Sequence, residues 1–135
     1  MTSDEFSDTT RYMESKTRNY KDLIVWQKGI ELAKLVYQLT TAFRADEKFG
    51  IIAQLRRAAV SVPSNLAEGQ ARRTTGEFVQ FISNAEGSIA EIDTQLILSC
   101  ELEFCSQQSA EPAFELVREL RKMVNVLRRT LLARS

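Results

Sequence analysis

The stretch SVPSNLAEG, residues 61–69, places a proline among small polar residues where a helix-like apolar repeat is still running. A proline inside a helix removes one backbone hydrogen bond and costs roughly 3 kcal/mol, so it bends or ends the helix. Here the repeat continues in phase past Pro63, at intervals of three and four residues. The stretch therefore predicts a kinked helix over residues 47–68, with Gly69 as its left-handed stop. The core positions of this helix are Ile52, Leu55, Ala59, Val62 and Leu66.

Three further segments carry helical patterns. Residues 22–42 have an apolar face wide enough for two packing partners. Thr74 and Glu77 form a capping box, T-x-x-E, ahead of a helix that we expect over residues 75–102. A fourth helix is expected over residues 110–132, after a cap at Ser109.

These segments predict one all-α domain. At 135 residues the chain has the length of a single ordinary domain, and its few glycines and prolines favour helices over turns. Four helices with short connections predict an up-down-up-down antiparallel four-helix bundle over residues 20–133. Residues 1–19 are polar and lack an apolar face, so we expect a flexible N-terminal arm there.

Composition restricts the function. Lysine plus arginine equals aspartate plus glutamate at 18 each, so no overall charge attracts nucleic acid or an anionic membrane. The chain has no histidine and none of the common phosphate-loop, dinucleotide or nucleophile motifs, so we expect no enzyme, metal or cofactor. No apolar run reaches the about 20 residues that cross a membrane. Cys100 and Cys105 are too few for a disulfide framework and are interpreted as packing residues of a cytoplasmic protein.

A polar seam runs beside the apolar stripe of the second predicted helix and meets polar residues of the third. In one interpretation, the Glu68 and Glu91 carboxylates pair and an arginine anchors an anion, which makes the seam a ligand pocket. In the other, the seam is a hydrogen-bond network that fixes helix register. The polar seam comprises Arg57, Ser61, Ser64, Asn65, Glu68, Ser88 and Glu91.

Positive charge gathers near the end of the fourth predicted helix. Cations suit the negative end of a helix dipole, and a solvated basic face is common, so one interpretation is structural. The alternative is a phosphate-binding surface for RNA or DNA, repeated around an oligomer. The candidate residues are Arg72, Arg73, Arg121, Lys122, Arg128 and Arg129.

A family resemblance is carried by the runs YKDLIVWQKGIELAKLVYQLT, FGIIAQLRRAAVSVPSNLAEG and EFVQFISNAEGSIAEIDTQL. They resemble the 23S rRNA-intervening-sequence proteins, a family of four-helix bundles whose biochemical role is largely unassigned. That family is similar to the accessory variability proteins of diversity-generating retroelements, which form pentameric barrels and work with a reverse transcriptase and RNA. The matching positions are Asp22, Leu23, Trp26, Gln54, Arg57, Ala58, Ser61, Pro63, Asn65, Glu68, Gly69, Phe78, Ala85, Ser88 and Glu91.

The chain departs from the family pattern at Gly29, where alanine is usual, and at Arg44, where proline is frequent. Its pI near 6.3 also differs from the strongly basic retroelement proteins. The resemblance implies a non-enzymatic homo-oligomeric scaffold, with a pentamer as the leading assembly and a nucleic-acid-processing protein as a partner. The alternative function is direct RNA or DNA binding through the basic fourth helix.

Overall fold

The computed structural model describes residues 19–134, and nearly all of the predicted arm, residues 1–18, lies outside them. Within the described residues every regular element is helical and there is no strand. The long helices are α2 (Ile24–Thr41), α3 (Ala53–Gln70), α4 (Thr75–Glu101) and α5 (Gln107–Arg134). The short turns are η1 (Tyr20–Asp22), η2 (Ala45–Glu47) and η3 (Lys48–Ile52).

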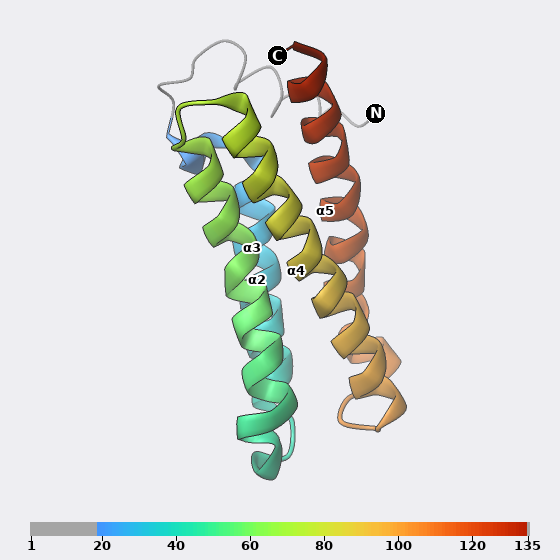
Figure 1. The fold of residues 1–135 in the computed structure, drawn as a ribbon. Helices are drawn as coiled ribbons and strands as arrows, with labels where there is room; N and C mark the ends of the chain where they lie inside the picture. The colour runs from blue at the N-terminus through green and yellow to red at the C-terminus, as the bar shows by residue number, and fades with distance from the viewer. Residues whose placement is uncertain (1–18, 135) are drawn as a thin grey trace.

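Figure 1 shows the four long helices lying side by side along one axis, each reversing the direction of the one before. α2 packs on α3, α3 on α4, α4 on α5, and α5 back on α2, so α2 and α4 occupy opposite corners of the bundle. The prediction of an all-α four-helix bundle is confirmed, and the path of the chain is compatible with the up-down order. The α3–α4 connection and the C-terminal end of α5 lie at one end of the bundle, and the other two connections lie at the opposite end (Figure 1).

The core consists mainly of aliphatic side chains, with several phenylalanines, that the helices turn inward at helical spacing. All the core positions predicted for the second helix are buried, from Ile52 to Leu66. Phe78 of α4 and Leu120 of α5 are buried with them, and each such side chain contributes about 1.5–3 kcal/mol. No helix in the described part of the chain is both long enough and apolar enough to span a membrane.

α3 begins and ends later than predicted. The backbone at Gly50 leaves helical geometry (φ −102°, ψ −113°), so the chain passes through η2 and η3 before the regular helix starts at Ala53. At its other end α3 continues through Gly69 to Gln70, and no glycine among residues 19–134 has a positive φ.

The predicted left-handed stop at Gly69 is therefore wrong. A Cβ at Gly69 would lie 2.7 Å from the Cβ of Phe81, so this glycine lets α4 approach α3 closely instead of ending the helix. α3 passes through Pro63 without interruption, and the bend predicted there stays a prediction.

The structure confirms the predicted cap of α4 and corrects the predicted cap of α5. The Glu77 N–H donates to the Thr74 hydroxyl oxygen at 3.1 Å, which confirms the cap of α4. The predicted cap of the fourth helix at Ser109 is wrong, because the Ser109 N–H donates to the Ser106 hydroxyl oxygen at 3.0 Å. Ser106 is thus the capping residue, and α5 gains most of a turn ahead of the predicted start.

Candidate functional site

The centre of the polar seam is a ladder of side-chain contacts between α3 and α4. Arg57 Nη2 donates to Glu91 Oε2 at 2.9 Å. One turn further along α3, the hydroxyl oxygens of Ser61 and Ser88 lie 2.5 Å apart, and both residues are half-buried. Contacts at two successive levels oppose sliding of α3 along α4, which is what the network interpretation requires.

Two glutamines extend this α3–α4 ladder, although sequence analysis did not assign them to it. Gln95 Nε2 donates to Gln54 Oε1 at 3.2 Å and to Glu91 Oε2 at 3.3 Å. The Gln95 Oε1 atom is buried and has no hydrogen-bond partner in the described part of the chain. The position of Gln95 in the sequence could have revealed this role. It lies beside Leu96 within the inward-facing repeat of α4, where a buried polar side chain needs hydrogen-bond partners.

The structure does not bring the Glu68 and Glu91 carboxylates together. Glu68 Oε2 lies 3.8 Å from Nη2 of Arg72, which follows just after the end of α3, whereas Glu91 lies opposite Arg57. Glu68 and Arg57 are separated by about three turns of α3, or roughly 16 Å. The predicted pairing of the two carboxylates is therefore wrong, and no group of three potential metal-ligating His, Cys, Asp or Glu side chains occurs among the described residues.

The other two seam residues differ in their surroundings. Asn65 Nδ2 donates to the Ser61 carbonyl within α3 at 2.7 Å, which satisfies a carbonyl close to Pro63. Ser64 is exposed and lines a hollow on the α2 side of the bundle, so it does not face α4. The seam that connects the two helices is shorter than predicted.

Two arginines of the predicted basic surface are engaged by carboxylates of α4. Arg128 Nη2 lies 2.5 Å from Glu86 Oε1, and the Arg128 side chain is mostly buried. Arg121 Nη2 lies 3.5 Å from Asp93 Oδ2. These two ion pairs tie α5 to α4, so both arginines have a structural partner.

The remaining basic residues make no ion pair with a carboxylate of α4 among residues 19–134. Arg72 stacks over the ring of Phe81, with 4.7 Å from its guanidinium carbon to the ring centroid. Arg73, Lys122 and Arg129 are exposed, and no ion pair is found for them within residues 19–134. Arg73 lies in the α3–α4 connection and Arg129 near the end of α5, which Figure 1 places at the same end of the bundle.

An apolar surface is exposed on the α2 side of the bundle. Ile30 and Tyr37 of α2 are 37% and 42% exposed, and Val60 of the neighbouring α3 is 44% exposed. Together with Ala33 they line shallow hollows along α2. We call these four residues the α2 face.

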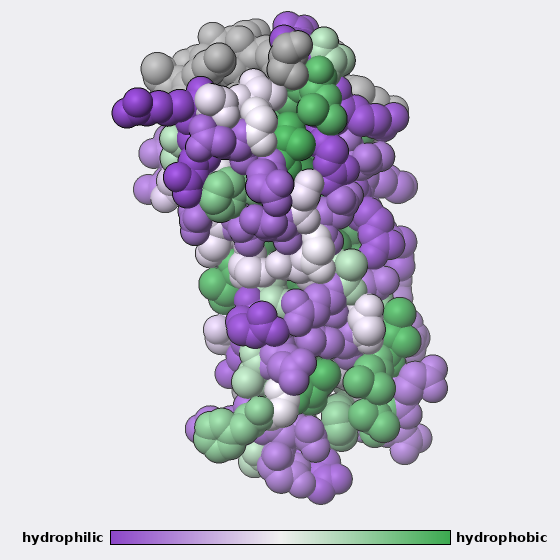
Figure 2. Space-filling view, in the orientation of Figure 1, coloured by the Kyte–Doolittle hydropathy of each residue, from purple (hydrophilic) through white to green (hydrophobic). Residues whose placement is uncertain are grey.

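A second apolar surface covers the carboxyl end of α4, and Figure 2 shows apolar side chains gathered there at the lower right. Ile97, Leu98 and Leu102 are all exposed large hydrophobic residues. We call these three residues the α4 face. Since α2 and α4 occupy opposite corners, the two faces lie on opposite sides of the molecule.

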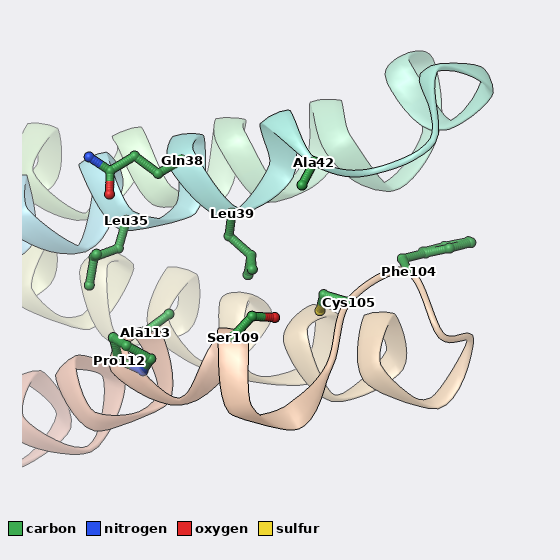
Figure 3. A pocket seen from close by; sticks show the side chains of 9 residues that line it. All are labelled: Leu35, Gln38, Leu39, Ala42, Phe104, Cys105, Ser109, Pro112 and Ala113. Atoms are coloured by element: carbon green, nitrogen blue, oxygen red, sulfur yellow. The ribbon is translucent and has the colours of Figure 1, made fainter.

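A pocket of about 350 Å³ lies between α2 and the start of α5. Figure 3 shows Leu39 of α2 reaching toward the first turn of α5, where Ser109 lies. The pocket has the size of a small ligand site but is lined by no carboxylate, lysine or arginine, so it offers burial and not acid–base chemistry. Its lining residues are Leu35, Gln38, Leu39, Ala42, Phe104, Cys105, Ser109, Pro112 and Ala113.

Comparison with known proteins gives a family and a likeness in fold to solved structures. No curated protein matches the chain. A crystal structure of a protein with unknown function from the S23 ribosomal protein family, from Bacteroides thetaiotaomicron VPI-5482, is 18% identical with a TM-score of 0.69, over 77% of this chain and 98% of that one. At this identity the likeness shows the fold alone. The model of the 23S rRNA-intervening sequence protein family matches residues 21–126, which include α2, α3, α4 and most of α5, so the chain belongs to this family.

Proposed function

We propose that the chain is the subunit of a non-enzymatic homo-oligomer that serves as an interaction scaffold in the cytoplasm. The observation that carries the proposal is the presence of two exposed apolar surfaces, the α2 face and the α4 face, on a bundle whose own core is complete. Soluble monomers rarely expose contiguous apolar surfaces unless a partner covers them. A second copy of the chain is the occupant that fits both faces at once.

Charge supports pairing of the α2 face with the α4 face of the next subunit. Lys34 is exposed beside the α2 face, whereas Glu101 and Glu103 are exposed beside the α4 face. Opposite charges at the rims favour this contact over the contact of either face with itself. A contact between two different faces is heterologous, and it generates a ring when the rotation between subunits closes.

The number of subunits in the ring comes from the family resemblance, which favours a pentamer. In such a ring each subunit offers one apolar face to each neighbour, because α2 and α4 lie at opposite corners. The ends of the bundle would remain available to a further partner, for which the resemblance favours a nucleic-acid-processing protein.

Native mass spectrometry of the full chain, purified at low salt without nuclease, tests the scaffold. We expect a species of five chains of 15.4 kDa each and no bound nucleic acid. A monomer at micromolar concentration would overturn the assembly. A heavier species that nuclease reduces to the pentamer would favour the alternative function below.

The alternative is direct RNA or DNA binding at the basic end of the bundle. The observation that favours it is the location of Arg73 and Arg129 at one end of the molecule, with no ion pair to a carboxylate within residues 19–134. Five copies in a ring would repeat these charges around one rim.

Salt dependence separates the two functions. Binding through phosphates weakens with salt, and each phosphate contact adds about 0.9 to the logarithmic slope. The double variant Arg73→Gln/Arg129→Gln removes two phosphate contacts from each subunit. It should therefore reduce the slope by roughly 2 for each subunit that contacts the nucleic acid. Arg118→Gln is the matched control, because Arg118 pairs with Glu111 on the first half of α5. The alternative would be contradicted if the wild type, the double variant and the control bound nucleic acid equally, or if none of them bound it.

A further inference from the structure

The carboxyl end of α4 brings the two cysteines of the chain into contact. The Sγ atoms of Cys100 and Cys105 lie 3.8 Å apart, and both thiols are free and half-buried. From the sequence they are expected to be packing residues, because two cysteines are too few for a disulfide framework. Their contact is a consequence of the way in which α4 ends.

α4 ends in a Schellman motif, which reverses the chain within a few residues. The Phe104 N–H donates to the Ser99 carbonyl at 2.9 Å, and the Glu103 N–H donates to the Cys100 carbonyl at 3.0 Å. Glu103 adopts the left-handed conformation that the motif requires, with φ of 63°. The reversal carries Cys105 back over the last turn of α4, so backbone hydrogen bonds hold the two thiols together.

We propose that Cys100 and Cys105 are a redox site, which forms a reversible intramolecular disulfide by exchange with a small cationic disulfide. The thiols are reached through a hollow at the end of the bundle, which Glu101 and Glu103 also line. These two carboxylates attract a cationic disulfide and repel an anionic one. The contact between the two thiols lies within one chain, so it requires neither the oligomer nor nucleic acid.

The surroundings of the two thiols assign their order of reaction. Burial, together with the hydrogen bond to Cys100 and the charge of a Cys100 thiolate, raises the pKa of Cys105 from 9.0 to about 12. Cys105 is therefore held as the thiol, and Cys100 is the attacking group, since the thiolate is the nucleophile in exchange.

The reaction balances in two steps. The Cys100 thiolate attacks one sulfur of the disulfide reagent, the reagent S–S bond breaks, and one reagent thiol leaves with a proton from solvent. Cys105 then loses its proton to solvent and attacks Cys100 Sγ, which releases the second reagent thiol. The protein dithiol is oxidised by two electrons, and the reagent is reduced to two thiols. The sulfurs approach from 3.8 Å to about 2.05 Å.

The test uses the full chain in cystamine and cysteamine redox buffers, followed by acid quenching, alkylation and intact mass measurement. We expect the oxidised chain to lose the mass of two hydrogen atoms, to resist alkylation, and to recover both thiols in reducing buffer. Oxidation should proceed several-fold faster with cystamine than with anionic oxidised glutathione, and this difference should shrink at high salt. Two retained thiols, two cysteamine adducts or a disulfide-linked dimer would each overturn the proposal.

Single variants test the order of attack. Cys105→Ser should trap one cysteamine adduct on Cys100, and Cys100→Ser should form its adduct several-fold more slowly. The reverse order of rates would overturn the assignment of Cys100 as the attacking thiol. Circular dichroism in reducing buffer checks that both variants are folded. If either variant is unfolded, the mass of the oxidised wild type alone decides whether the disulfide forms.

Discussion

Gly29 and Gly69 are both buried inside helices, yet an added methyl group meets different surroundings at each. At Gly29 a Cβ would lie 3.4 Å from the Cβ of Pro63, an ordinary van der Waals contact. We expect Gly29→Ala to stabilise the fold by up to about 1 kcal/mol, because alanine is the better helix former. We expect Gly69→Ala to destabilise it by about 1–2 kcal/mol, because its Cβ would lie 2.7 Å from the Cβ of Phe81.

Urea unfolding followed by circular dichroism, at one fixed protein concentration, measures both changes. Gly87→Ala on α4 is the control, since an added Cβ there meets nothing within 4 Å and reports helix propensity alone. If Gly69→Ala gained as much stability as Gly87→Ala, the close approach of α4 to α3 would not need this glycine. The sequence pattern singled out Gly69 but assigned it the wrong role. A glycine that ends a helix and a glycine that allows two helices to pack closely cannot be distinguished in a single sequence.

Glu103 occupies the left-handed position that ends α4, with φ of 63°. A residue with a Cβ costs roughly 1–2 kcal/mol in this conformation, and glycine does not. Glu103→Gly is therefore expected to raise the free energy of unfolding by about 1 kcal/mol, or the Tm by about 3–4 °C. Glu103→Ala is the control, because it removes the carboxylate but keeps the strain. Equal stabilisation by both variants would assign the effect to charge repulsion among Glu101, Glu103 and their neighbours instead.

At the scale of the element, the start of α5 depends on Ser106. Its hydroxyl oxygen accepts the N–H of Ser109 at 3.0 Å, and its carbonyl accepts the N–H of Ala110 at 3.2 Å. Ser106→Ala should destabilise the bundle by about 1 kcal/mol, the usual cost of losing an N-cap. Ser109→Ala removes the residue that the sequence favoured as the cap, and we expect it to change stability by less than about 0.5 kcal/mol. Thermal unfolding of the two variants decides, and a larger loss in Ser109→Ala would contradict the observed cap.

The elements themselves were predictable, but their ends were less so. Thr74 was found because T-x-x-E is a specific signal, whereas Ser106 and Ser109 are both serines ahead of the same apolar repeat. The start of α3 was missed because the periodicity that continues into α3 does not reveal the non-helical backbone at Gly50. In the candidate site, spacing placed Ser61 and Ser88 on facing surfaces, but it did not fix the level at which Glu68 lies along the bundle.

At the scale of the whole molecule, the apolar stripe of α2 shows that a single sequence does not determine which surface covers an apolar face. Ile30 and Tyr37 lie on the predicted apolar face, and the width of that face predicted two packing partners. The structure leaves both residues exposed. Periodicity measures only that a surface is apolar, and it does not distinguish burial by the same chain from burial by another copy. An experiment on the assembly is needed to tell the two apart.

A mixing experiment tests whether the α2 face and the α4 face bind each other. Tyr37→Glu disrupts the α2 face and Leu98→Glu disrupts the α4 face, and both positions are exposed in the subunit, so the bundle should stay folded. In a heterologous ring neither variant assembles alone, since every contact needs one intact face of each kind. Mixed together, they should form a heterodimer and nothing larger, because one intact pair of faces remains. Native mass spectrometry distinguishes the two variants by mass.

Phe49→Glu is the matched control for adding a charge at an exposed apolar residue. Phe49 is 91% exposed in η3, outside both faces, so this variant should keep the wild-type assembly. If the α2 face bound a second α2 face, the contact would be isologous and Leu98→Glu alone would still form dimers. If both variants assembled as the wild type does, neither face would lie in the interface. Only a contact between the α2 face of one subunit and the α4 face of the next produces the heterodimer, which fixes the direction in which successive subunits follow one another.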